Sequence, residues 1–391
     1  MPDVALLALI LVAILAGYFL GFKDRKRRNR SAPEQPLSRE YFVGLNYLLN
    51  EQTDEAIETF IKALDLNNDT VDTYLALGTL FCRRGEVDKS IRVHQDLLAR
   101  PSLTDSQSVR VQLELAKDYM SAGLYDRAEA MLAELSRQNH DYRIEALREL
   151  LKIYEYEKDW GRAVEVAEQL RRFTGEIYGP VLAHLYCEQA ELCLSHNDRT
   201  GARKFIRQAF SRDRNCVRAS LILAGMESAE GNTREAIKVL ERISRQDIRY
   251  VPLSLPLLEE AYARLGNNRG LGAYLARCLN ERPGTAIILS MTRMLIYSHG
   301  EDYAQGYLAN QLRKSPSLRG LNELMKLQLR NPTVESLTSI SLLKDVTDNM
   351  LETKPVYKCS ACGFSGREMH WLCPGCHTWG AVAPVQGIEG E

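Results

Sequence analysis

The segment DYMSAGLYDRAEAML, residues 118–132, contains the spacing that decides the fold. Ala116 lies just before it, Tyr119 follows three residues later, Ala128 nine residues after that and Leu132 four residues further on. Small residues at the first and third of these positions let two helices pack closely, and the aromatic ring fills the space toward a neighbouring pair. The segment therefore predicts one antiparallel helix hairpin.

This spacing recurs with a period of 34 residues, which is the tetratricopeptide pattern. Gly85, Gly123 and Gly231 stand where the first helix of a pair should end in a left-handed turn. Beyond Val251 the pattern weakens. The copies are Gly44/Tyr47/Ala56/Phe60/Ala63, Tyr74/Gly78/Phe81/Ser90/His94/Leu97, Ala116/Tyr119/Ala128/Leu132/Leu135, Leu151/Tyr154/Ala163/Ala167/Leu170, Ala190/Ala202/Ile206/Ala209 and Ala224/Ala236/Leu240/Ile243, continued by Tyr262, Gly266 and Leu275. We predict an all-α tetratricopeptide-repeat solenoid over residues 37–352.

An uncharged run at the N-terminus predicts a membrane anchor within residues 1–22. Val4–Phe22 contains 19 residues without a charge, enough at about 1.5 Å per residue to cover nearly all of a hydrocarbon core about 30 Å thick. A signal peptide would carry its positive charge before the run, but the basic cluster KDRKRRNR follows it at residues 23–30. This asymmetry predicts a single span with the short N-terminus outside, and a basic stop and linker over residues 23–36 before a cytoplasmic body.

Four cysteines near the C-terminus have the spacing C-x2-C-x10-C-x2-C and predict a metal module over residues 353–391. A disulfide staple, a redox centre and a metal site are the alternatives, and a reducing cytosol leaves the thiols free to bind metal. We expect Cys359, Cys362, Cys373 and Cys376 to hold one iron or zinc ion. His370 and His377 are expected to be neighbours, not ligands. The other cysteines, Cys82, Cys187, Cys193, Cys216 and Cys278, are expected to be small core residues.

Aromatic residues surround these cysteines. Tyr357, Phe364, Trp371 and Trp379 either form the small core of the module, or one or two of them pack onto the repeats.

Composition argues against nucleic-acid binding and against catalysis. The chain is 26% charged with a net charge of −1, so its basic residues are balanced by acids. It contains no nucleophile elbow, no phosphate-binding glycine loop and no metalloprotease helix motif. We expect a protein that binds other proteins and is not an enzyme.

The repeat register also predicts a partner-binding surface on the concave face of the array. Six residues are expected to point toward it and to attract an acidic segment of a partner: Arg110, Leu113, Lys117, Arg148, Lys152 and Arg218.

The anchor, the basic stop, the repeat sequences RGEVDKSIRVHQDLL and DYMSAGLYDRAEAML, and the terminal YKCSACGF and HWLCPGC together resemble the lipopolysaccharide assembly protein B family of Gram-negative bacteria. The resemblance covers essentially the whole chain. It implies a rubredoxin-like module, with the four cysteines as metal ligands, that packs against the repeats as a clamp on the end of the solenoid.

The resemblance also implies a function. The protein would be an inner-membrane adaptor that works with the membrane-anchored AAA metalloprotease to degrade the lipid A-pathway deacetylase, opposed by an inner-membrane regulator with a periplasmic domain. Two alternatives remain: a non-proteolytic scaffold for envelope assembly proteins, and a rubredoxin-like redox carrier.

Overall fold

The computed structural model describes residues 71–138, 141–175, 178–330 and 337–388, together with 43–44, 46–47, 52, 55–56 and 58–59. They fall into two compact units, one up to Tyr142 and one from Arg143 onward. The predicted anchor and linker, residues 1–36, lie outside the described residues. No helix in the described part is both long and apolar enough to cross a bilayer.

Within residues 71–138, the first unit forms two helix hairpins. In the connection between α5 (Val87–Leu98) and α6 (Asp105–Ser121), Thr104 forms a capping box with Gln107, which fixes the start of α6. Gly85 and Gly123 have φ angles of 82° and 73° at the turns inside the hairpins, as their positions in the repeat predict. The hairpins pair α4 (Val71–Arg83) with α5 (Val87–Leu98), and α6 (Asp105–Ser121) with α7 (Tyr125–Arg137).

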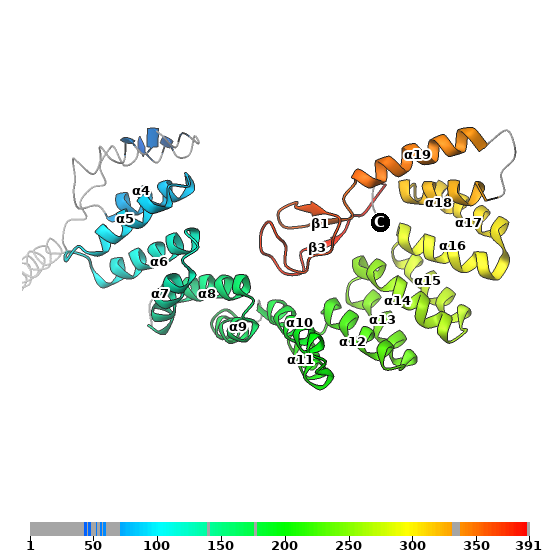
Figure 1. The fold of residues 1–391 in the computed structure, drawn as a ribbon, viewed down its shortest axis with the longest axis horizontal. Coiled ribbons are helices and arrows are strands. Elements are labelled where there is room, and N and C mark those ends of the chain that lie inside the picture. Colours follow the sequence, from blue (N-terminus) through cyan, green and yellow to red (C-terminus); the bar gives the residue numbers. More distant parts are fainter. Residues whose placement is uncertain are drawn as a thin grey trace, which may run out of the picture. The chain divides into compact units, whose positions relative to one another are not determined.

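The second unit continues the same alternation in a row of paired helices (Figure 1). The prediction of a tetratricopeptide-repeat fold is confirmed. The helices are α8 (Arg143–Glu157), α9 (Trp160–Thr174), α10 (Gly179–Ser195), α11 (Arg199–Arg212), α12 (Val217–Ala229), α13 (Thr233–Gln246), α14 (Val251–Arg264), α15 (Asn268–Glu281), α16 (Thr285–His299), α17 (Glu301–Lys314), α18 (Leu318–Gln328) and α19 (Leu337–Thr353), with a short 3-10 turn, η2 (Ile248–Tyr250), before α14.

The small residues of the repeat lie where two helices of a pair touch. Ala128, Ala163, Ala202 and Ala236 are fully buried, one in each of four successive second helices. A larger side chain at these positions would push the paired helices apart, because protein interiors are packed as tightly as crystals. Phe60 and Ala63 of the first copy lie outside the described residues.

His94 occupies a core position where most copies have an apolar residue. It is completely buried, and its Nδ1 lies 2.6 Å from Oδ2 of Asp118 in α6. A Cβ atom on Gly78 would lie only 2.2 Å from His94 Nε2. Gly78 therefore leaves room for the imidazole ring, and the two positions depend on each other.

Paired helices continue beyond Val251, where the sequence pattern weakens. In this part the core contains large side chains such as Tyr274 and Leu258, each almost fully buried, beside small ones such as Ala261 and Ala304. Small residues therefore still lie where helices meet, so the architecture persists although the sequence pattern weakens.

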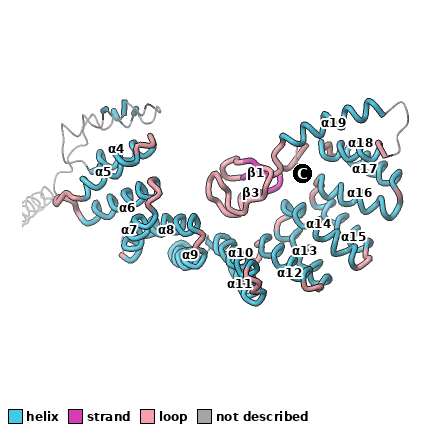
Figure 2. The backbone as a smooth tube through the Cα atoms, in the orientation of Figure 1, coloured by secondary structure: helices cyan, strands magenta, loops and turns pink. Residues whose placement is uncertain are grey.

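The C-terminal module is a small three-stranded sheet (Figure 2). Its strands are β1 (Tyr357–Cys359), β2 (Ser365–Gly366) and β3 (Val382–Pro384), in the antiparallel order β2-β1-β3. Tyr357 lies opposite Gly366 on one side and Pro384 on the other. So few strand residues bury little apolar surface, and such a module needs a metal or a neighbouring surface to stay folded.

Candidate metal centre

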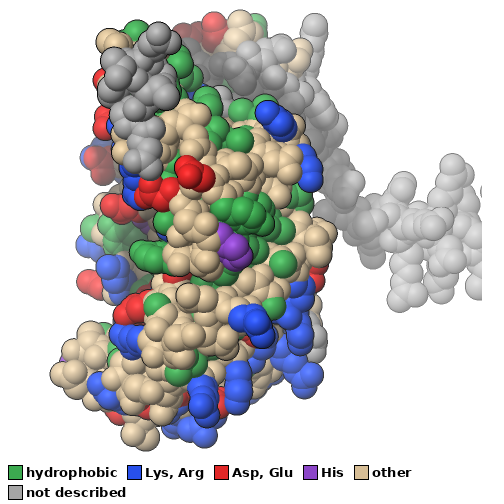
Figure 3. Space-filling view, turned by 90° about the vertical axis from the view of Figure 1, so that its right-hand side faces the viewer, with side chains coloured by type: hydrophobic (Ala, Val, Ile, Leu, Met, Phe, Trp, Pro, Cys, Tyr) green, Lys and Arg blue, Asp and Glu red, His purple; other side chains and the backbone are tan. Residues whose placement is uncertain are grey.

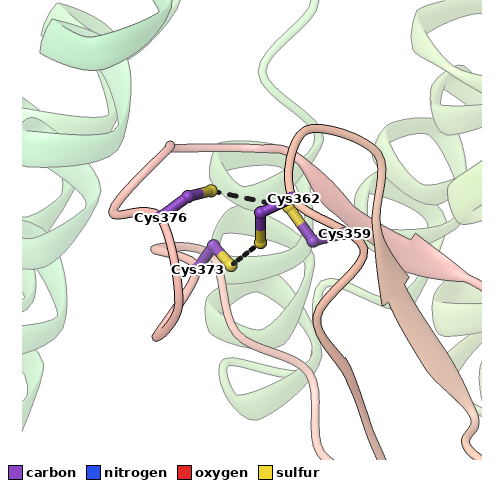
Figure 4. Close-up of side chains that lie close together, drawn as sticks. All are labelled: Cys359, Cys362, Cys373 and Cys376. Atoms are coloured by element: carbon purple, nitrogen blue, oxygen red, sulfur yellow. Dashed lines mark hydrogen bonds between the residues drawn. The ribbon is translucent and has the colours of Figure 1, made fainter. Parts of the chain in front are cut away.

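The four predicted cysteines meet at one point of the module (Figure 4). Cys359 Sγ lies 3.7 Å from Cys376 Sγ, Cys362 Sγ lies 3.6 Å from Cys373 Sγ, and all four sulfur atoms lie within 4.8 Å of one another. Sulfurs about 2.3 Å from one tetrahedral metal would be about 3.8 Å apart, whereas a disulfide needs about 2.0 Å. The cluster therefore has the dimensions of a tetrathiolate metal site.

Hydrogen-bond donors around the sulfurs favour the thiolate form at Cys359 and Cys376, whereas desolvation and the neighbouring cysteines raise the pKa of the Cys362 thiol to about 12. The backbone N–H groups of Ala361 and Phe364 each lie 3.4 Å from a cysteine sulfur, Cys359 and Cys362 respectively. Thr378 Oγ1 lies 3.3 Å from Cys376 Sγ, and its hydroxyl with its backbone N–H lowers the pKa of the Cys376 thiol to about 6. Donors aimed at the sulfur stabilise its negative charge.

Four sulfurs in a closed shell suit both zinc and iron. When bound, such an ion holds the two cysteine loops together. Cys359 and Cys373 are buried, whereas Cys362 is exposed. The residues present fit a resident metal ion.

His370 and His377 are placed beside the cluster without joining it. The ring of His370 packs edge-on against Phe364, with the ring centroids 6.2 Å apart. His377 has a positive φ of 51° and marks the turn that presents Cys376. Among the other cysteines, Cys187, Cys216 and Cys278 are buried, as expected for core residues, while Cys82 and Cys193 are half-buried.

The module lies against the helices of the second unit through its two tryptophans. Trp379 Nε1 donates a hydrogen bond of 2.7 Å to Glu155 Oε1 in α8, across 224 residues of sequence. His184 of α10 stacks on Trp379 with centroids 5.3 Å apart and contacts Trp371 at 5.7 Å. The four aromatic residues were predicted either to form the core of the module or to pack, one or two of them, onto the repeats. Trp371 and Trp379 pack onto the repeats.

Tyr250 of η2 adds a second anchor point for the module. Its hydroxyl lies 2.9 Å from the carbonyl oxygens of both Gly380 and Val382. Gly380 has a φ of +63°, and a Cβ atom there would lie 3.1 Å from His184 Nε2. A residue other than glycine would be strained and would also press against the histidine.

Burial at this interface shifts the pKa of its titratable groups. Desolvation, with a smaller contribution from the nearby Arg218 charge, lowers the pKa of His184 to about 3. Desolvation also raises the pKa of Glu155 and raises that of Tyr250 to about 12. His184 is therefore neutral at physiological pH, and its Nδ1 has no hydrogen-bond partner among the described residues.

Two family models match the sequence of this chain. The one described as "Rubredoxin metal binding domain" matches residues 357–384, and the one described as "Protein kinase G tetratricopeptide repeat" matches residues 75–255. Lipopolysaccharide assembly protein B of Escherichia coli strain K12 is 33% identical over 386 residues, which cover 98% of this chain and 99% of that protein. This chain belongs to the lipopolysaccharide assembly protein B family.

A second member, from Haemophilus influenzae, is 32% identical and covers 98% of both chains. Among solved structures, the crystal structure of MamA matches 44% of this chain with a TM-score of 0.34 and 17% identity.

The position of the module corrects one expectation drawn from the family resemblance. The module was expected to clamp the end of the solenoid. It does follow α19 directly and bonds to that end, because Leu318 N–H donates to the Ile388 carbonyl, but its tryptophans also contact α8 and α10, which are distant in sequence. In Figure 1 the module lies on the inner side of the curved row formed by α8 to α19.

Two of the six residues expected on the partner surface are wrongly placed by the sequence. Leu113 is only 1% exposed and belongs to the core. Arg218 is 4% exposed, and its guanidinium binds Glu188 and Glu191 at 2.8 Å each. Projecting a helical register fixes the face of a helix only to within a residue, so a core position and an internal ion pair were read as surface.

The other four residues do not form an unbalanced basic face. Arg110 lies 2.6 Å from Asp72, Lys117 lies 2.8 Å from Glu114, and Lys152 lies 2.7 Å from Glu149. Arg148 contacts the hydroxyl of Tyr178 at 3.3 Å. Acids one helical turn away or on a neighbouring helix neutralise most of this charge, which the spacing of basic residues alone does not reveal.

His184, Glu155 and Tyr250 are the residues that sequence reasoning missed. His184 and Glu155 lie on ordinary repeat helices, and no motif marks any of the three as contacts of a module more than a hundred residues away. The one available signal was the pair of tryptophans beside the cysteines. Large side chains on so small a module need another surface of the protein to cover them.

Proposed function

We propose that this protein is a non-enzymatic adaptor of the inner membrane that promotes degradation of the lipid A-pathway deacetylase by the membrane-anchored AAA metalloprotease. It would thereby limit lipopolysaccharide synthesis, with an opposing inner-membrane regulator that carries a periplasmic domain. Residues 1–22 would anchor it, leaving the rest of the chain cytoplasmic.

The observation that carries this proposal is the match along nearly the whole length to proteins named for lipopolysaccharide assembly, combined with an array of helix hairpins. Helix hairpins in a row present long surfaces that suit binding of other proteins. The metal centre has a closed set of four sulfurs, which suits a structural role better than catalysis.

The docked module would give the second unit of the adaptor a fixed shape. Its contacts with α8, α10 and η2 tie together helices that are otherwise joined only through their neighbours. A client and a protease must be held in a defined geometry for one to be delivered to the other. The metal would serve this function by keeping the module folded.

A pulse-chase measurement tests the proposal. The half-life of the deacetylase is followed in cells that lack the chromosomal gene and carry the intact chain, no chain, or the variant Trp379→Ala. We expect a short half-life only with the intact chain, and a longer one with Trp379→Ala because the module loses its contact with Glu155. Tyr297→Ala, at a side chain of α16 that is 87% exposed, is the matched aromatic control.

A scaffold without a role in proteolysis would give a different result. The word "assembly" in the names of the relatives favours this second candidate. In that case the deacetylase half-life would be equal with and without the chain, while other envelope assembly proteins would no longer be captured together. A redox carrier would instead show an absorption spectrum that changes reversibly with reductant.

A further inference from the structure

A cavity between α11 and α13 carries four arginines. It has a volume of about 630 Å³ and lies where the last turns of both helices meet the connection between α11 and α12. Its lining includes Arg207, Arg214, Arg242 and Arg245, and no carboxylate. We call these four residues the arginine pocket. Figure 3 shows lysine and arginine side chains gathered over the lower part of the face in view.

The four arginines differ from their neighbours because none forms an ion pair with a carboxylate of the described residues. Arg203 on α11 binds Glu227 and Glu230, at 2.5 Å and 2.6 Å. Arg212, also on α11, lies 2.6 Å from Glu168. Arg199 and Arg234 also have no carboxylate partner among the described residues, but they lie outside the cavity. The arginine pocket is distinguished by four such arginines in one place, which leave a concentrated positive charge.

Part of the arginine pocket is held in place by neighbouring side chains. The guanidinium of Arg242 lies 4.4 Å from the centroid of the Phe210 ring and donates a hydrogen bond of 3.1 Å to Ser220 Oγ. Ser220 in turn donates to Gln246 Oε1, and Gln246 Nε2 donates to the carbonyl of Arg214. Desolvation lowers the pKa of the Arg242 guanidinium although the residue as a whole is exposed, and a bound anion would offset this effect.

The C-termini of the two helices offset only a small part of this positive charge. Arginines near a helix C-terminus are stabilised by its partial negative charge, about −0.5 of an elementary charge for each helix. The C-termini of α11 and α13 would together offset about one of the four positive charges. A positive charge of roughly three remains for a ligand.

We propose that the arginine pocket binds a phosphorylated ligand carrying two neighbouring phosphate groups. Guanidinium groups match phosphate oxygens through paired N–H donors, and a diphosphate places several negative charges within a few ångströms. An acidic peptide carries one charge per side chain, spread along an extended backbone, and suits an open groove better than a cavity. The ligand is either a soluble phosphorylated compound or the head group of a lipid, which share this chemistry.

Calorimetric titration of the full chain in detergent with inorganic pyrophosphate tests the proposal. The variant Arg214→Gln/Arg245→Gln removes two exposed arginines whose side chains make no hydrogen bond with a described residue. The control Arg199→Gln/Arg234→Gln makes the same charge change at exposed arginines in the first turns of α11 and α13, outside the cavity. Equal melting temperatures for both variants and the native chain show that each is folded.

We expect one saturable site whose affinity falls about tenfold or more in the pocket variant and less than about twofold in the control. Tighter binding of soluble dioctanoylglycerol pyrophosphate than of pyrophosphate would support a lipid head group as the ligand, and equal or weaker binding would support a soluble phosphorylated ligand. The proposal is overturned if no saturable binding occurs, if both variants lose affinity equally, or if a hexaglutamate peptide binds more tightly than pyrophosphate.

Discussion

At the scale of single residues, the metal centre depends on four sulfur atoms and the donors around them. Cys373 is completely buried and lies 3.6 Å from Cys362 Sγ. Its loss would leave three sulfurs and an open position, which binds a structural metal poorly. The remaining sequence of the module is too short to fold around a core of its own.

Replacing Cys373 with serine should therefore lower the metal content of the purified chain to well below one ion per molecule, measured by elemental mass spectrometry. Protease should also cut the C-terminal module faster. Cys82→Ser, at a half-buried thiol outside the cluster, should keep its metal. A Cys373→Ser variant with full metal occupancy would show that this residue is not a ligand.

A second residue-scale prediction concerns the close contact of Gly78 with His94. Gly78→Ala would place a methyl group 2.2 Å from the present position of His94 Nε2, and overpacking of this kind costs about 1–3 kcal/mol of unfolding free energy. Gly225→Ala is the matched control, because nothing lies within 4 Å of a Cβ atom there. The control should be neutral or stabilising by about 0.5–1 kcal/mol, since alanine favours a helix. Denaturant unfolding measures both, and equal stability of the two variants would contradict the steric argument.

At the scale of elements, α10 and the module are joined through a histidine that must stay neutral. His184 is 8% exposed and contacts both tryptophans of the module. Protonation would place a charge in this interface without a carboxylate to accept it. Glu155 lies on the other side of Trp379, and its carboxyl receives a hydrogen bond from the indole. The contacts that hold the module on α8 and α10 are therefore made by His184 and Glu155, whose protonation states affect the stability of this interface.

Stability should consequently fall as the pH drops below the ordinary histidine pKa of 6.5. The pKa of His184 is lowered to about 3 in the folded chain, so the unfolded chain binds more protons between these values and gains stability relative to the folded one. The loss is at most about 1.4 kcal/mol for each pH unit. Glu155, whose pKa is raised in the folded chain, acts in the opposite direction closer to its own pKa of 4.5.

Unfolding free energies measured from pH 7.5 to pH 5.5 check this expectation where the histidine dominates. The variant His184→Gln should show a flatter pH dependence than the native chain, because glutamine does not titrate. A native chain whose stability stays constant over this range, or a variant with the same slope, would show that His184 is not the group responsible.

At the scale of the whole molecule, the charge asymmetry around Val4–Phe22 predicts a single orientation in the membrane. Protease added to intact spheroplasts should leave residues 23–391 undigested, because they would lie on the cytoplasmic side of the inner membrane. Lysing the spheroplasts should make the same residues accessible and serves as the control. Digestion from outside would reverse the predicted topology, and the argument for free thiols in a reducing compartment would fail with it.

The sequence by itself determined the features that repeat at fixed spacing. The period of 34 residues identified the hairpins because small residues and turn glycines such as Gly123 must recur wherever two helices touch. The spacing of the four cysteines identified the metal centre because ligands close in sequence are brought to one ion by tight turns. Both signals are local, so neither required knowledge of the tertiary structure.

Only the tertiary structure decided which distant surfaces meet. Trp379 and Glu155 are 224 residues apart, and nothing in either local sequence specifies the other. The burial of Leu113 and the internal pairing of Arg218 with Glu188 depend on the exact rotation of each helix, which a repeat register does not fix. The arginine pocket likewise combines residues of two helices and a turn. Whether each arginine has a carboxylate partner depends on which side chains the packing of these elements brings together. Contacts of this kind depend on three-dimensional proximity, and a one-dimensional pattern does not encode it.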